Sequence, residues 1–210
     1  MWVSELENCW RGQAALIVTG GPSSQLCEAS DFGHCKTIGV NYAHRIWPCD
    51  LLVVVKDYIY SDICTEIEPA KIVAPSYGEI PKDKYTEHYM YKAAKPHPSS
   101  VESKKKKNCL YSDKAGGTGV AIHLAHILGA NPIYVIGADL CMGKDEQYHA
   151  KGYWETDKFK PMGWRQTIDD VKRVFSEQHE HLTQVQKELA GVGRRVYFVY
   201  PQHWRSFCES

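Results

Sequence analysis

The chain has 210 residues, of which 43% are hydrophobic and 24% charged, and its formal net charge is zero. These values are typical of one globular domain that buries its own core, and the balanced charge gives no indication of a nucleic-acid or membrane partner. No apolar run reaches the roughly 18 residues of a membrane span, and the N-terminus lacks the pattern of a secretory signal. The eight cysteines form no CxxC pair, so we expect reduced thiols in a cytoplasmic protein and no metal site.

The elements follow one another in an alternating pattern. Residues 2–10 predict a short amphipathic helix. Helical spacing predicts a helix near 118–128, with Thr118 as N-cap and Gly129 as its stop, and a longer helix over 168–189. Almost wholly apolar runs predict strands covered on both faces, at residues 14–19, 37–41, 51–55, 71–74, 132–137 and 195–200. Together they predict a single α/β domain over 1–210, Rossmann-like, with a mostly parallel sheet and helices on both faces.

Two segments, about 76–115 and 141–165, interrupt this pattern and predict lids or insertions. Unstructured segments of this length are usually functional or mobile. The first holds one possible extra strand near 88–91 and a run of basic residues, Lys104, Lys105, Lys106 and Lys107. Such a run is usually a solvated loop, and the alternative is a surface that binds a phosphate-rich acceptor such as DNA.

Two glycine-rich turns are the strongest candidates for a ligand site. In parallel sheets ligands bind beyond the carboxyl ends of the strands, and glycines there let backbone amides approach a phosphate. Neither turn matches the dinucleotide or P-loop pattern, so each is also compatible with a plain turn or a tightly packed helix start. The turns consist of Gly20, Gly21, Pro22 and Ser23, and of Gly116, Gly117, Thr118 and Gly119.

Polar residues follow three of the predicted strands. Asn41, Asp57 and Asp139 could hold a ribose, a metal or an acceptor, although such residues also favour local turns. The second lid adds Tyr148, His149 and Tyr153, and the last helix adds His179. A histidine suits general base catalysis and a tyrosine can donate to a departing phosphate; the alternative for each is a satisfied or surface side chain.

The first turn, Asn41, the segment 48–57 and the block 116–139 carry a family resemblance. Over residues 14–57 and 115–140 the chain resembles the bacterial and viral sialyltransferase-like glycosyltransferases and the related MptE-like 6-hydroxymethylpterin diphosphokinases. The first resemblance implies metal-independent, inverting transfer from a nucleotide-sugar, with no tightly bound cofactor. It implies donor contacts from Gly21, Pro22, Ser23, Asn41, Gly117, Thr118 and Gly119, with Tyr148 and Tyr153 at the leaving phosphate and His179 as base. Gly20 stands where that family has an asparagine.

The MptE-like resemblance implies a different reaction at the same place. It implies diphosphate transfer from ATP to a pterin, with Asp57 and Asp139 holding magnesium. We expect the glycosyltransferase, with His179 or His149 as base and a glycan as acceptor, or a hydroxylated base of phage-type DNA if the lysine run is functional. A non-catalytic nucleotide or nucleic-acid binding module is the third hypothesis.

Overall fold

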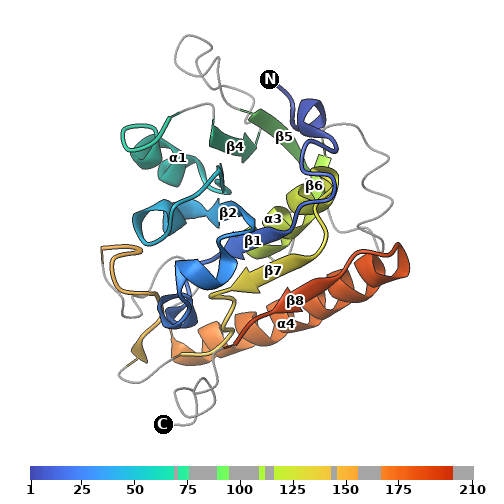
Figure 1. Ribbon diagram of the computed structural model, residues 1–210. Coiled ribbons are helices and arrows are strands. Elements are labelled where there is room, and N and C mark those ends of the chain that lie inside the picture. Colours follow the sequence, from blue (N-terminus) through green and yellow to red (C-terminus); the bar gives the residue numbers. More distant parts are fainter. Residues whose placement is uncertain are drawn as a thin grey trace.

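The computed structural model describes residues 1–68, 71–75, 89–94, 109–111, 116–142, 146–155 and 167–200. In this part of the chain, strands form one sheet in the order β6-β5-β4-β3-β2-β1-β7-β8, and all neighbours pair in parallel (Figure 1). The strands are β1 (Ala15–Val18), β2 (Lys36–Val40), β3 (Leu51–Val53), β4 (Ile72–Pro75), β5 (Tyr89–Ala94), β6 (Cys109–Tyr111), β7 (Ile133–Ile136) and β8 (Val196–Phe198).

The apolar runs become strands because both faces of the sheet are covered. Successive side chains of a strand point to opposite faces, and all four residues of β1 are buried. Ile17 belongs to the core that contains the α3 helix, whereas Leu16 and Val18 belong to the core on the opposite face. The parallel sheet and the cover on both faces confirm the fold class expected from the sequence.

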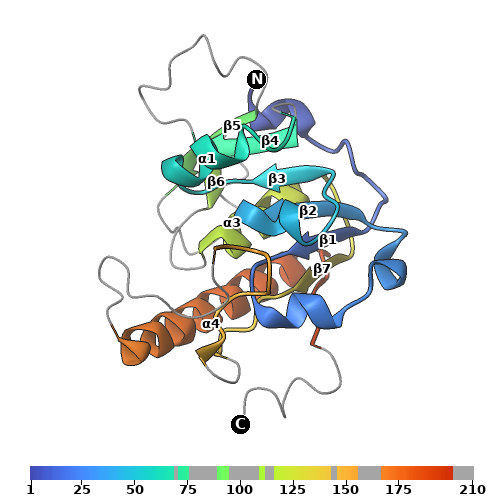
Figure 2. The ribbon, with the colours of Figure 1, turned by 90° about the vertical axis from the view of Figure 1, so that its left-hand side faces the viewer.

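The two faces are covered by different elements. Helices α3 (Gly116–Ile127) and α4 (Ile168–Gly191) contact each other on one side of the sheet (Figure 2), and α4 runs along β8 (Figure 1). The other face is covered by α1 (Asp57–Ile63), the adjoining 3-10 turn η4 (Asn41–Arg45) and residues of the segment 146–155. Further 3-10 turns are η1 (Val3–Leu6), η2 (Pro22–Leu26) and η3 (Ala29–Phe32). Within the described residues, no helix is both long and apolar enough to cross a membrane.

Two local predictions were wrong. Residues 2–10 form only η1, because the amides of Asn8 and Trp10 donate to carbonyls at the end of α3, those of Ile127 and Leu128, instead of continuing a helix. Helix α3 begins at Gly116, so Thr118 lies inside the helix and is not its N-cap.

The predicted lid 76–115 contains two strands of the sheet. The extra strand expected near 88–91 is β5, which pairs with β4, and β6 then extends the sheet beyond it. β6 has only three residues, and its partner β5 lies well before it in sequence, so a local pattern could not identify it. The rest of that lid, including Lys104 to Lys107, lies outside the described residues.

The central strand should be sensitive to the loss of buried volume. Leu16 is fully buried in β1, whereas Leu26 at the end of η2 is 49% exposed. Leu16→Ala should lower the free energy of unfolding by about 2–5 kcal/mol, because it removes apolar contacts and leaves a cavity. The control Leu26→Ala should change it by less than about 0.5 kcal/mol. Urea denaturation of both variants checks this, and equal effects would contradict the assigned core.

Candidate functional site

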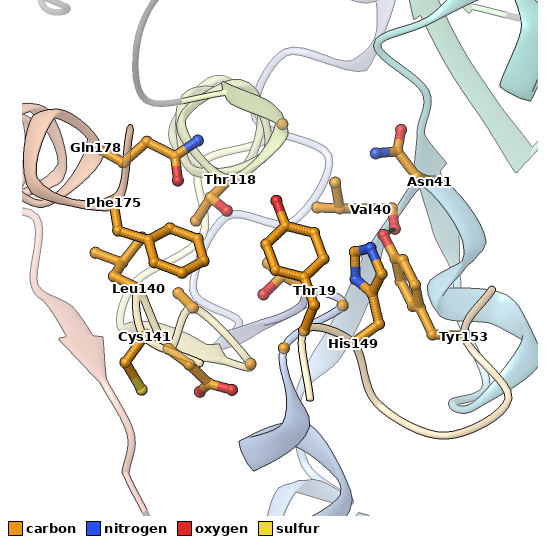
Figure 3. A pocket seen from close by; sticks show the side chains of 17 residues that line it. Thr19, Val40, Asn41, Thr118, Leu140, Cys141, His149, Tyr153, Phe175 and Gln178 are labelled. Atoms are coloured by element: carbon orange, nitrogen blue, oxygen red, sulfur yellow. Dashed lines mark hydrogen bonds between the residues drawn. The ribbon is translucent and has the colours of Figure 1, made fainter. Parts of the chain in front are cut away.

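A cavity of about 180 Å³ lies at the carboxyl ends of β1, β2 and β7 (Figure 3). In the sheet, β1 lies between β2, the next strand along the chain, and β7, a strand that follows much later. In parallel sheets a crevice forms at such a position, because the connections on the two sides of β1 run in opposite directions. Its wall includes residues of both glycine-rich turns, residues of the segment after β7 and residues of α4: Thr19, Gly20, Gly21, Val40, Asn41, Gly117, Thr118, Gly137, Ala138, Asp139, Leu140, Cys141, Tyr148, His149, Tyr153, Phe175 and Gln178.

The first glycine-rich turn is bound to the segment that follows β7. The amide of Gly21 donates to the carbonyl of Gly137 at 2.9 Å. The amide of Ser23 donates to Oδ2 of Asp139 at 2.8 Å, and the Ser23 hydroxyl donates to Oδ1 of the same carboxyl group. We call Ser23 and Asp139 the β1–β7 latch.

The latch gives this turn a structural role. The amides of Gly21 and Ser23 already donate hydrogen bonds within the protein, and Pro22 has no amide hydrogen to offer a phosphate. Pro22 and Ser23 are buried beneath the turn and are not on the cavity wall. Gly21 is needed for close packing, since a Cβ atom there would lie 2.2 Å from the Gly137 carbonyl oxygen.

Asp139 is the acidic residue on the cavity wall. Burial raises the pKa of its carboxyl group to about 6, while the two hydrogen bonds from Ser23 act in the opposite direction. A carboxylate with a pKa near 6 is ionised at neutral pH and can still accept a proton readily. This combination of position and pKa suits a general base.

The second glycine-rich turn forms the N-terminus of α3. Gly117 and Thr118 are on the cavity wall, whereas Gly116 and Gly119 are not. The first amides of a helix have no acceptor within the helix and favour an anion. A Cβ atom on Gly117 would lie 2.6 Å from Cγ1 of Val40, so glycine lets the helix approach the end of β2.

Gln178 of α4 reaches the same helix end, and the sequence did not identify it. Its Nε2 would lie 3.2 Å from a Cβ atom on Gly116, and Figure 3 shows its amide beside the start of α3. The signal was present, because Gln178 occupies the apolar face of α4. Its neighbours at helical spacing on that face are Val171, Phe175, Leu182 and Val185.

Asn41 lies at the opposite end of the cavity. It has a φ of 53°, a left-handed conformation that asparagine tolerates better than most residues. Its Oδ1 accepts from the Val55 amide at 3.3 Å, and its side chain is hydrogen bonded to the Tyr153 hydroxyl. The Tyr153 hydroxyl donates to the Val40 carbonyl at 2.9 Å, and burial raises its pKa. Tyr153 thus fixes the positions of Val40 and Asn41 by hydrogen bonds.

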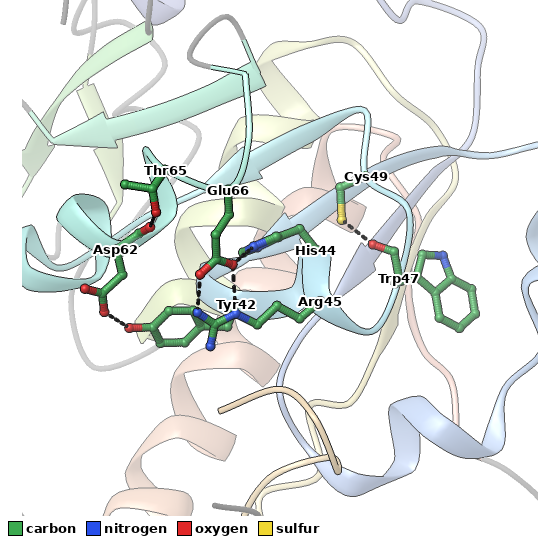
Figure 4. Close-up of polar contacts among 8 residues, drawn as sticks. All are labelled: Tyr42, His44, Arg45, Trp47, Cys49, Asp62, Thr65 and Glu66. Carbon is green, nitrogen blue, oxygen red and sulfur yellow. Dashed lines mark hydrogen bonds and ion pairs between the residues drawn. The ribbon is translucent and has the colours of Figure 1, made fainter. Parts of the chain in front are cut away.

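Ion pairs hold the η4 turn that carries Asn41 (Figure 4). Arg45 donates to Glu66 from Nε at 2.9 Å and from a terminal nitrogen at 2.5 Å, and His44 lies 2.7 Å from the same carboxylate. The hydrogen bonds from Arg45 lower the pKa of Glu66 to about 2. The Tyr42 hydroxyl donates to Asp62 at 2.6 Å. These contacts tie η4 to α1 and to the residues that follow it.

Stacked rings line the middle of the cavity. The Tyr148 ring stacks on Phe175 of α4 at 5.8 Å between centroids, and the His149 ring stacks on Tyr153 at 5.2 Å. Tyr148 and His149 meet edge to face at 4.4 Å. The segment after β7 is therefore packed between α4 and the core. This packing places the side chains of Tyr148 and His149 on the cavity wall.

A second cavity, of about 600 Å³, adjoins the first. Asp139, Leu140, Cys141 and Phe175 lie on the walls of both. His179 lies on the wall of the second cavity but not on that of the first. The two histidines predicted as base candidates therefore occupy different cavities.

The two aspartates of the magnesium hypothesis follow strands that are not neighbours in the sheet. Asp57 begins α1 after β3, whereas Asp139 follows β7, and three strand spacings, about 14 Å, separate β3 from β7. Ligands of one Mg²⁺ ion lie about 2.1 Å from it, so the separation of these two strands does not favour a shared ion. No cluster of three His, Cys, Asp or Glu side chains suited to a metal occurs among the described residues.

Comparison with known proteins shows a distant structural similarity. No protein-family model matches the chain, and a search among curated proteins finds no match. The chain is similar to the MAf glycosyltransferase from Magnetospirillum magneticum AMB-1, with a TM-score of 0.46 and 12% identity. The similarity covers 95% of this chain but 37% of that protein, so the chain spans little more than a third of its length.

The raised pKa of Asp139 predicts a distinct pH dependence of stability. Because the pKa rises from 3.8 to about 6 on folding, the folded state binds the proton more tightly than the unfolded state. Stability from this group is therefore present below pH 4 and is lost as the pH rises through about 6, by about 3 kcal/mol. The difference in unfolding free energy between wild type and Asp139→Asn should change by this amount between pH 4 and 7.

A matched control is Asp31→Asn, at an exposed position in η3. Its difference from wild type should stay nearly constant over the same range, measured by urea denaturation at each pH. A constant difference for Asp139→Asn as well would show that Asp139 is not desolvated as described.

Proposed function

We propose that the protein is a glycosyltransferase that transfers a sugar from a nucleotide-sugar to a hydroxyl acceptor, with inversion and without a metal ion. The observation that carries this proposal is the continuous wall from Asn41, past the start of α3, to Asp139, where the first cavity adjoins a second. A transferase needs a site for an anionic donor and an adjoining site for an acceptor, with a base between them. The resemblance of the two glycine-rich segments to sialyltransferase-like enzymes agrees with it.

The positions of the residues suggest how the donor lies. Figure 3 shows Asn41 on one side, Thr118 in the middle, and Phe175 and Cys141 on the other. The donor phosphate binds the amides at the start of α3, and the nucleoside extends toward Asn41. The sugar then lies toward Phe175, where the two cavities share their walls. At about 180 Å³ the first cavity is smaller than the ~300–1,000 Å³ of typical ligand pockets, so the donor fills it and reaches beyond it.

The chemistry then follows from the placement of Asp139 and Tyr148. Asp139 removes the proton from the acceptor hydroxyl, whose oxygen forms a bond to the anomeric carbon. The bond between that carbon and the donor phosphate oxygen breaks, and the nucleotide leaves with both electrons. The Tyr148 hydroxyl and the α3 amides stabilise the charge that develops on the phosphate, which is the role a cation would otherwise have.

Asp139 is a better candidate for the base than either histidine. It lies on the walls of both cavities, as a group between donor and acceptor must. His149 stacks on Tyr153 in the first cavity, and His179 lies in the second. We therefore propose that His149 contacts the donor and that His179 contacts the acceptor.

Calorimetry against a panel of nucleoside mono- and diphosphates and their sugars tests donor binding. Thr118→Glu places a negative charge at the proposed phosphate site, and an acidic residue in the first turn does not destabilise a helix. It should weaken nucleotide binding at least about tenfold, equivalent to about 1.4 kcal/mol. Thr183→Glu on α4, at a similarly half-buried position, should bind like wild type. Failure of every nucleotide in the panel to bind the wild-type protein would refute the proposal.

Removal of the Tyr148 hydroxyl tests leaving-group stabilisation. Tyr148→Phe keeps the ring that stacks on Phe175 but loses the donor, so kcat for donor hydrolysis should fall about 10²-fold. Nucleotide affinity should change little, since the contact strengthens only as charge develops. The control Tyr197→Phe, at an exposed position of β8, should keep full activity. Release of the nucleotide can be followed by phosphorus NMR, and an unchanged kcat for Tyr148→Phe would remove Tyr148 from the mechanism.

A further inference from the structure

The second cavity has a composition that the proposed reaction does not by itself require. At about 600 Å³ it is within the size range of sites that enclose small molecules. Leu140, Met142, Phe175 and Tyr200 give it an apolar and aromatic wall, and α4 contributes the polar groups. The cavity can therefore hold one or two sugar rings beside Asp139.

The polar groups from α4 form one basic strip. Lys172, Ser176 and His179 follow one another at intervals of four and three residues, so they share a face of the helix. Among the described residues, neither Lys172 nor His179 has an ion-pair or hydrogen-bond partner. By contrast, the adjacent Arg173 is paired with Asp170 at 3.3 Å, outside the cavity wall.

The acidic residue of this wall is already engaged elsewhere. Both oxygens of Asp139 accept hydrogen bonds from Ser23 at the inner end, where the cavities meet. Lys172 and Asp139 form no ion pair within 4 Å. The cavity therefore offers a positive charge and a histidine that have no partner in the part of the chain that the structure describes.

We propose that the second cavity is the acceptor subsite and that it selects an acidic saccharide, whose carboxylate or phosphate binds Lys172 and His179. This rests on the proposed function. The acceptor hydroxyl points to Asp139 at the shared wall, and a ring face lies against Phe175 or Tyr200. An ammonium and an imidazole are donors that suit an anionic group on a small ligand.

Ligand-detected NMR with matched sugars tests the selection. Galacturonic acid and galactose 6-phosphate supply the two anionic groups, and galactose is the neutral control. The acids should bind about tenfold more tightly than galactose, as expected for one well-placed charge pair. Lys172→Glu should abolish this preference. Lys187→Glu, an exposed position on the same helix away from the cavity, should retain it.

Each outcome bears on one of the two proposals. Preference for either acid that depends on Lys172 supports the acceptor proposal, and the tighter acid identifies the anionic group. Equal binding of galactose and both acids, or an undiminished preference in Lys172→Glu, overturns it. Nucleotide calorimetry on the same variants separates the two. If nucleotides bind and acids are not preferred, the acceptor proposal alone fails; if no nucleotide binds wild type, the proposed function fails.

Discussion

The site depends on the β1–β7 latch, in which Ser23 donates two hydrogen bonds to Asp139. β1 and β7 are neighbours at the point where the chain connections diverge, and the latch joins the segments that follow them. Burying a carboxylate without hydrogen-bond partners costs free energy. The hydrogen bonds from Ser23 therefore stabilise Asp139, and Asp139 fixes the position of the first glycine-rich turn. Gly21 and Gly137 are in contact beside this pair, and there is no room for a side chain between them.

Because of the latch, the two glycine-rich turns have different roles although their sequences are similar. The first turn uses its amides to join two strands, which leaves few of them for a ligand. The second turn begins a twelve-residue helix, whose first amides have no acceptor within the helix and whose dipole favours an anion. The glycines of the first turn thus serve packing, and Gly117 of the second brings the helix end to the crevice.

Much of the fold could be predicted because it depends on local patterns. Apolar runs with turn residues after them identified six strands, and the strand-end rule placed Asn41, Asp139 and both turns at one edge. The remainder depends on contacts that are distant in sequence. Ser23 was expected to bind a phosphate, but its partner is Asp139, 116 residues away. Tyr153 was expected at the leaving group, but its hydroxyl is bonded to Val40 in the core. Gln178 could have been found as the polar residue on an apolar helix face.

The central claim is that the donor phosphate binds the N-terminus of α3 and that the first turn has a structural role. A crystal structure of the protein with a bound nucleotide tests it most directly. The account predicts phosphate oxygens within hydrogen-bond distance of the Gly117 and Thr118 amides, with the Ser23–Asp139 hydrogen bonds intact. Phosphate bound instead to the amides of Gly21 and Ser23, with the latch broken, would contradict it.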